Sequence, residues 1–275
     1  MARGRKLETL DDYKRALKGK YGVGEKANYK PWLRVQDVKS HGTRSQIWGK
    51  KTGRVHHTLS SIETQFFYIS EFCDSVVDIR EQFPLFPLNN SEKIARLLDI
   101  EHPFVPKTRT PNVFTTDFLL TRLVNGQLVY EAISVKPADE LTDLRVLEKL
   151  EIERIWWESL GVRFFIFTGN ENTAIYSRNI SWVTAPYRSS KAPFSEATIE
   201  LALSYLSEGK IFVKEICNDL LGAAGIENVE PLDLLRYLIA EKFVVVDMSE
   251  LLEESSLLEI LKVSKLSSQV PSGYR

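Results

Sequence analysis

The sequence feature that most constrains the fold is an Asn-Gly pair at positions 125 and 126, between two apolar-rich segments in FTTDFLLTRLVNGQLVYEAISVK. This pair is favoured in two-residue type I′ turns, because both central residues of that turn need a positive φ. The sequence therefore predicts an antiparallel hairpin over residues 114–136, with the Asn-Gly pair as its loop.

The predicted hairpin register brings an acidic and a basic residue together. Asp117 falls opposite Ser134, and Lys136 follows two residues later on the same face. Residues that face each other diagonally across a hairpin lie within reach of long side chains, so Asp117 and Lys136 are expected to be neighbours. The opposite face is apolar and predicts a core contact, through Phe118, Leu120, Ile133 and Val135.

The segments around the hairpin predict an α/β domain. TLSSIETQFFYISEF predicts a helix capped by Ser60 or Ser61, with Glu63 in its first turn. SVVDIREQFPL predicts a strand, and residues 87–112 predict a long loop. ADELTDLRVLEKLEIERIWWESLG predicts a long helix ending at Gly161, and VRFFIFT a short buried strand. This order of elements is typical of a mixed sheet flanked by helices.

Beyond about residue 169 the pattern changes, and we expect a second, smaller domain. YRSSKAP resembles a linker, helices are predicted near 195–207, 210–221 and 231–241, and KFVVVDMS predicts a strand. Three short helices and a strand favour a winged-helix-like fold. We therefore expect a first domain with a basic N-terminal arm over 1–168, and a winged-helix-like domain over 169–275.

The last segment of the chain has leucines at helical spacing. They would either dock into a partner's groove or close the domain's own core: Leu251, Leu252, Leu257, Leu258 and Leu261.

Charge is concentrated at the N-terminus. Residues 1–57 hold fifteen Lys or Arg against five Asp or Glu, although the net charge of the whole chain is −1. A basic arm ahead of an acidic body is typical of a polyanion-binding surface, and nucleic acid is the natural partner. A solvated, flexible tail is the alternative. The stretch KPWLRVQDV is expected to be extended, and the expected DNA contacts are Lys30, Trp32, Arg34, Lys50, Lys51, Arg54, His56 and His57.

One set of residues suits phosphodiester hydrolysis. That reaction needs charge neutralisation at the phosphate and an activated water, and carboxylates holding Mg²⁺ supply both. A lysine beside the metal stabilises the charge that develops on the phosphate. Glu63, Asp117 and Lys136 form such a set. We expect two Mg²⁺ ions per site, with Mn²⁺ as an alternative. The competing interpretation is that these charged residues are simply solvated strand ends.

Six stretches of the sequence resemble the TnsA family, the endonuclease subunit of heteromeric cut-and-paste transposases. They occur in the family's order between about residues 30 and 183: KKTGRVHHTLSSIE, VVDIREQFPL, TTDFLL, SVKPA, LEKLEIERIWW and FFIFT. The resemblance implies a restriction-endonuclease-like fold for the first domain, with Glu63, Asp117 and Lys136 as catalytic residues. It also implies a further acidic metal position at Glu153, for which an ion pair with Lys149 on the helix surface is the alternative.

One position departs from the family pattern. Related nucleases carry an acid two residues before the lysine, where this chain has Ser134. A hydroxyl is a poorer Mg²⁺ ligand than a carboxylate. The second metal position is therefore expected to use the backbone carbonyl of Val135, Glu63, or phosphate and water oxygens instead. Arg80, Glu81 and Gln82 end a strand beside the site. They would either orient the metal ligands or form surface ion pairs.

The resemblance implies a function and its partners. A TnsA-type subunit nicks the 5′ ends of the transposon, a TnsB-type transposase cuts and joins the 3′ ends, and an AAA+ regulator of the TnsC type contacts the C-terminal domain. A standalone restriction-like or repair nuclease and a catalytically inactive DNA-binding scaffold are the rivals. The sequence has no apolar run near the roughly 20 residues of a membrane span, and its two cysteines, Cys73 and Cys217, are far apart. We therefore expect a bacterial cytoplasmic protein that associates with the nucleoid during transposition.

Overall fold

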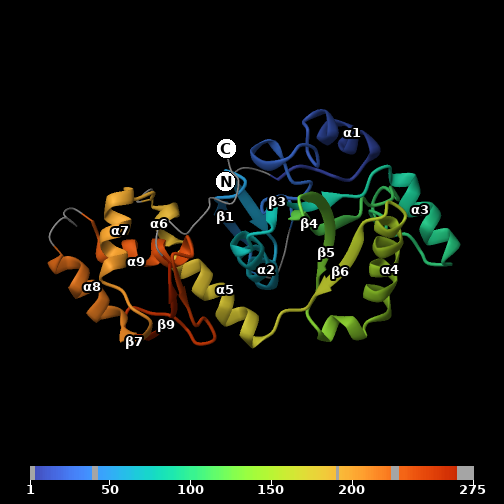
Figure 1. Cartoon of the computed structure of the whole chain (residues 1–275). Coiled ribbons are helices and arrows are strands. Elements are labelled where there is room, and N and C mark those ends of the chain that lie inside the picture. The colour runs from blue at the N-terminus through green and yellow to red at the C-terminus, as the bar shows by residue number, and fades with distance from the viewer. Residues whose placement is uncertain (1–3, 39–42, 190–191, 224–228, 265–275) are drawn as a thin grey trace. The chain divides into compact units, whose positions relative to one another are not determined.

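The structure is a computed structural model that describes residues 4–38, 43–189, 192–223 and 229–264. The chain divides into two compact units, Met1–Gly169 and Asn170–Arg275, drawn from blue to yellow-green and from yellow to red in Figure 1. Each unit has its own sheet and its own helices. None of the helices in the described ranges is long and apolar enough to cross a membrane.

A four-stranded mixed sheet forms the centre of the first unit. Its strand order is β3-β4-β5-β6, with bounds Val76–Pro84, Thr115–Val124, Gln127–Val135 and Arg163–Phe167. β3 and β5 both pair antiparallel with β4, and β6 pairs parallel with β5. The predicted mixed α/β sheet is therefore confirmed.

The hairpin of β4 and β5 has the predicted register. Asn125 has φ +51° and Gly126 φ +78°, as a type I′ turn requires, and Val124 pairs with Gln127 at the loop. The pairing continues without a shift to Phe118 and Ile133. On one face of the sheet the alternating apolar residues enter a core cluster as predicted: Phe118, Leu120, Ile133 and Val135.

Two helices cover the two faces of this sheet (Figure 1). α2 (Ser61–Phe72) places Phe67 in the cluster that contains Phe118, and its N-cap is Ser60, one of the two caps that the sequence predicted. α4 (Leu144–Glu158) packs Ile152, Trp156 and Trp157 against the other face. A short 3₁₀ turn, η2 (Asp139–Thr142), precedes α4, and Asp143 caps the helix through its side chain.

The N-terminal region packs onto the same unit. It contains α1 (Leu10–Lys18), a 3₁₀ turn η1 (Lys26–Asn28), and a small hairpin of β1 (Ser45–Gly49) and β2 (Arg54–Thr58). The stretch 30–38, expected to be extended, instead folds into turns. The carboxylate of Asp37 accepts hydrogen bonds from the backbone nitrogens of Arg34 and Arg5 and draws the chain back on itself.

Two further elements of this unit differ from expectation. Residues 87–112 were expected to form a loop but include α3 (Leu88–Leu97), whose Ala95 packs into the core with Leu85. β6, expected to be buried, is the last strand in the sheet order, so Phe165 and Ile166 are exposed.

The second unit combines helices with a three-stranded sheet of order β7-β9-β8. The three predicted helices and the predicted strand are confirmed as α7 (Glu196–Ser204), α8 (Val213–Gly222), α9 (Pro231–Ala240) and β8 (Val244–Val246). The sequence did not predict α5 (Glu171–Val183), α6 (Ala185–Arg188), β7 (Gly209–Phe212) or β9 (Leu257–Val263). α6 covers part of the stretch expected to be a linker, whose Ser190 and Lys191 lie outside the described residues.

The C-terminal leucines do not form the helix that their spacing suggested. Residues 257–263 are strand β9, so alternate residues share a face: Leu258 and Ile260 are buried, whereas Leu257 and Leu261 are exposed. Leu252 is also buried. The core interpretation therefore holds for Leu252 and Leu258, and the winged-helix assignment of this unit stays a prediction.

Candidate active site

Asp117 and Lys136 meet at the open end of the β4–β5 hairpin, as its register predicts. Lys136 Nζ lies 3.1 Å from Asp117 Oδ2 and also donates to the Val135 carbonyl oxygen at 2.9 Å. The backbone nitrogen of Val135 donates to the same carboxylate oxygen at 2.7 Å, and the hydroxyl of Ser134 does so at 3.4 Å. The hairpin backbone thus holds the Asp117 carboxylate in one place.

Glu63 reaches the site from the first turn of α2. The helix cap fixes its backbone, because Ser60 Oγ accepts from the Glu63 nitrogen at 3.1 Å. Its carboxylate accepts from the backbone nitrogen of Leu59 at 2.9 Å, and the side chain is only 6% exposed. A helix N-terminus favours a carboxylate, which offsets part of the cost of burying this one.

Gln82 connects the two carboxylates. Its Nε2 donates to Glu63 Oε2 and to Asp117 Oδ1, both at 3.3 Å. One amide nitrogen therefore lies between an acid on a helix and an acid on a strand. Of the two roles considered for residues 80–82, orientation of the site acids fits Gln82 alone. Arg80 and Glu81 form ion pairs instead, with Asp78 and Arg54, but these pairs are buried rather than on the surface.

The proximity of the two acids changes their ionisation. Burial, and then the nearby charge of Asp117, raise the pKa of Glu63 to about 7. Burial acts to lower the pKa of Lys136, but the Asp117 and Glu153 carboxylates outweigh it and raise that pKa, which keeps the lysine charged. A divalent cation would compete with the proton on Glu63, so we expect cation binding to strengthen as the pH rises through about 7.

Glu153 extends the acidic cluster from α4. It is 5% exposed, and its Oε1 is buried without a hydrogen-bond partner. Burial first, and the Asp117 charge second, raise its pKa to about 8. Glu153 is thus an interior residue beside Asp117 and Lys136, whereas Lys149, its expected surface ion-pair partner, is exposed.

The raised pKa of Glu153 predicts a pH-dependent stability of the metal-free protein. An acid whose pKa is higher in the folded state stabilises the fold while protonated, and that stability is lost as the pH rises from about 4.5 through about 8. Glu153→Gln keeps the neutral form at every pH. We expect the variant to melt at least ~3 °C above the parent at pH 8.5, the effect of ~1 kcal/mol in a domain of this size.

The matched condition for this comparison is about pH 3.5, where the two melting temperatures should agree because Glu153 is protonated in both the folded and the unfolded protein. Thermal melts followed by circular dichroism in a chelator measure both. Equal melting temperatures at pH 8.5 as well would show that Glu153 is ionised and stabilised there, in conflict with its environment.

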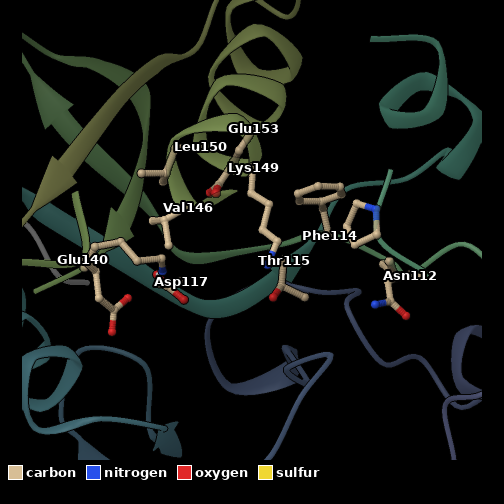
Figure 2. A pocket seen from close by; sticks show the side chains of 12 residues that line it. Asn112, Phe114, Thr115, Asp117, Glu140, Val146, Lys149, Leu150 and Glu153 are labelled. Atoms are coloured by element: carbon tan, nitrogen blue, oxygen red, sulfur yellow. The ribbon is translucent and has the colours of Figure 1, made fainter. Parts of the chain in front are cut away.

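A pocket of about 380 Å³ opens beside these residues, between α4 and the segment before β4. Figure 2 shows Asp117, Lys149 and Glu153 among the side chains that line it. Its walls combine apolar groups, including Phe114 and Leu150, with charged ones. This mixture suits a sugar-phosphate better than a purely apolar ligand.

The donor atoms at this site fit a hard divalent cation. Asp117, Glu63 and the Val135 carbonyl offer oxygen ligands. The buried Oε1 of Glu153 has no hydrogen-bond partner, and a bound ion or its water would provide one. Within the described residues, no group of three or more His, Cys, Asp or Glu side chains is placed to hold a metal by itself. Backbone, water and phosphate oxygens would complete the coordination.

Several expected DNA-contact residues lie on the surface. Lys30 and Lys50 are exposed, and Lys51 and His57 are partly buried. Lys50 and Lys51 form the turn between β1 and β2, and Arg34 is partly buried and paired with Asp37.

Three other expected DNA contacts lie in the interior instead. Trp32 is 2% exposed and packs edge-on against Tyr13 and Phe86. Arg54 and His56 are buried because both bind the carboxylate of Glu81, with Arg54 Nη2 at 2.6 Å and His56 Nδ1 at 2.8 Å. These side chains have no surface to offer DNA. An alternation of aromatic and basic residues cannot show which of them face inward.

Comparisons with known proteins give matches to both units of the chain. The model described as "TnsA-like endonuclease N terminal" matches residues 73–169, and the one described as "TnsA endonuclease C terminal" matches residues 173–248. The first match includes Asp117, Lys136 and Glu153, and Glu63 precedes it. The Tn7 transposition protein TnsA of Escherichia coli is 37% identical over 231 residues, which are 84% of this chain and 83% of that protein.

Proposed function

The chain belongs to the TnsA family of endonucleases, and on that premise we propose that it nicks the 5′ ends of a transposon during cut-and-paste excision. It would act as one subunit of a heteromeric transposase at the bacterial nucleoid. The observation that carries the proposal is the convergence of Glu63, Asp117 and Lys136 beside a pocket, with Gln82 between the two acids.

Each residue of the site has a distinct role in the proposed hydrolysis. Glu63, Asp117 and the Val135 carbonyl would hold Mg²⁺, or Mn²⁺, at one or two positions. The bound cation supplies positive charge to the phosphate and acidifies the attacking water. Glu153, buried beside Asp117 with a raised pKa, would hold a proton near the site or join a second ion through water.

Lys136 contributes a fixed positive charge. Two contacts of its Nζ, to Asp117 Oδ2 and to the Val135 carbonyl, fix the ammonium group, and the side chain remains 28% exposed. An ammonium group has three protons, so one remains for the scissile phosphate. A charge held in place before the reaction stabilises the charge that develops on the phosphate oxygens without reorganisation.

We also propose the partners of this reaction. A TnsB-type transposase would cut and join the 3′ ends, and an AAA+ regulator of the TnsC type would contact the second unit. The similarity of both units to TnsA endonuclease models supports an assembly of this kind. Transposon-end DNA would lie along the first unit, where Lys30 and Lys50 are exposed.

The turn between β1 and β2 gives the DNA contact a direct test. Replacing Lys50 and Lys51 by glutamine should weaken binding to duplex DNA of any sequence. The slope of log binding constant against log salt concentration should also become less negative by ~2, about one for each lost phosphate contact. Titrations by fluorescence anisotropy at several salt concentrations measure the slope.

The matched control replaces Lys93 and Lys107, both exposed and outside this turn, by glutamine. This double variant should keep the parent slope. If both double variants change the slope equally, binding depends on net charge alone and the β1–β2 turn has no special role.

Strand mapping on labelled transposon ends tests the proposed function against its rivals. With the partner transposase and Mg²⁺, we expect this chain to add 5′-end nicks to the partner's 3′-end cuts. Cutting of plain duplex by the isolated chain would favour a standalone nuclease. Unchanged products with and without the chain would favour a DNA-binding scaffold.

A further inference from the structure

Gln82 has an unusual backbone conformation near the end of β3, the first strand in the sheet order. Its neighbours Glu81 and Phe83 pair with Phe118 and Thr116, so Gln82 lies opposite Asp117. Its φ is +48°, in the region that residues other than glycine rarely adopt, and it is 2% exposed.

The surrounding chain fixes this conformation from outside the site. The carbonyl of Gln82 accepts a hydrogen bond from the backbone nitrogen of Trp32 at 3.2 Å. The carbonyl of Glu81 accepts one from the hydroxyl of Tyr29 at 3.0 Å. Strained residues held in this way are concentrated at functional sites, which points to a functional role for the side chain of Gln82.

Both polar ends of the Gln82 amide make hydrogen bonds within the site. Its nitrogen lies 3.3 Å from the Glu63 and Asp117 carboxylates, and its Oε1 accepts from Thr115 Oγ1 at 3.3 Å. Two carboxylates facing one atom need either a hydrogen-bond donor or a cation between them. The amide nitrogen therefore occupies the place that suits a cation.

We propose that Gln82 is a metal-responsive positioning residue: its amide nitrogen holds Glu63 and Asp117 together until a divalent cation binds, and the amide then turns over so that Oε1 faces the cation. This inference rests on the proposed metal-dependent function of the same site. It assigns Gln82 a role in metal binding in addition to the acids.

Thr115 makes this turn possible without loss of hydrogen bonding. A hydroxyl both donates and accepts, so Thr115 Oγ1 can donate to Oε1 before the turn and accept from Nε2 after it. The buried amide keeps a partner in both orientations. A glutamate at this position has no nitrogen to donate, and an asparagine is one methylene shorter, so glutamine is the side chain that meets both requirements.

The test uses the full chain titrated with Mg²⁺ at pH 7.5. The side-chain amide protons of Gln82, assigned by NMR through bonds from its own backbone, report the turn directly in the parent protein. We expect them to shift over the Mg²⁺ range that raises the melting temperature. The Gln82→Glu variant adds a third carboxylate, and like charges repel until a cation joins them. Without metal it should therefore melt at a lower temperature than the parent. The rise in its melting temperature should be half complete at a Mg²⁺ concentration at least ~10-fold lower than in the parent.

The control is Gln127→Glu, which adds the same charge at the exposed far end of β5 and should leave the Mg²⁺ midpoint within about twofold of the parent. A second variant, Asp117→Asn, separates the two levels of the argument. If it keeps the full melting response to Mg²⁺, the proposed site itself is wrong. If it loses that response but the Gln82 signals stay fixed in the parent during the titration, the metal site stands and the role of Gln82 is overturned.

Discussion

Asp117→Asn is expected to lower the rate of 5′-end strand cleavage by at least ~10²–10³-fold, the loss seen when one charge-stabilising group is removed from a hydrolase. The asparagine has the shape of aspartate, and its carbonyl oxygen can still accept from the Val135 nitrogen and from Lys136. The fold should therefore survive. The negative charge that faces Glu63 and the pocket is lost, and cation affinity falls with it.

Single-turnover cleavage of an end-labelled transposon end, reconstituted with the partner transposase, measures this rate. The matched control is Asp99→Asn, at an exposed turn after α3 where φ is +55°, a conformation that asparagine tolerates well. The control should cleave at the parent rate. A variant at position 117 that also cleaves at that rate would remove Asp117 from the chemistry.

Lys136→Met should lower the cleavage rate about as much as Asp117→Asn, but it should not lower the affinity for the divalent cation. Methionine fills the space of the lysine stem and removes the charge that we assign to the scissile phosphate, so cleavage should fall by ~10²-fold or more. Asp117 also loses the cation 3.1 Å from its Oδ2. Competition for that carboxylate disappears, so the affinity for a divalent cation should stay equal or rise.

The combination of slower cleavage with undiminished metal binding distinguishes a lysine that acts on the phosphate from one that only holds the fold. Calorimetric Mn²⁺ titration gives the affinity, and the strand-cleavage assay gives the rate. Lys93→Met, on the exposed face of α3, is the control and should change neither. If Lys136→Met weakens metal binding and cleavage in parallel, the lysine serves to build the site rather than to act on phosphate.

Local sequence chemistry was sufficient to predict the strand half of the site. One Asn-Gly turn determines the register of β4 and β5, and that register alone makes Asp117 and Lys136 neighbours. Glu63 could be placed in the first turn of a helix from its cap, but not beside Asp117, because that contact depends on how α2 packs on the sheet. The family resemblance connected the two parts.

The residues that sequence reasoning misplaced depend on long-range packing. Trp32 and His56 follow a basic, aromatic pattern, yet one is held in an aromatic cluster and the other against the buried Glu81. The role of Gln82 depends on a positive φ that glutamine does not signal in a sequence. The C-terminal leucines have a helical spacing, but those at positions 257–261 lie in strand β9, because this segment pairs with β7 and β8.

The most direct test of the central claim is a crystal structure of the full chain grown with Mn²⁺ and measured at the manganese absorption edge. We expect at least one anomalous peak within about 2.5 Å of an Asp117 carboxylate oxygen, the range of direct coordination, with Glu63 and the Val135 carbonyl as its other protein ligands. A peak that avoids all three residues, at a Mn²⁺ concentration that supports strand cleavage, would contradict this account.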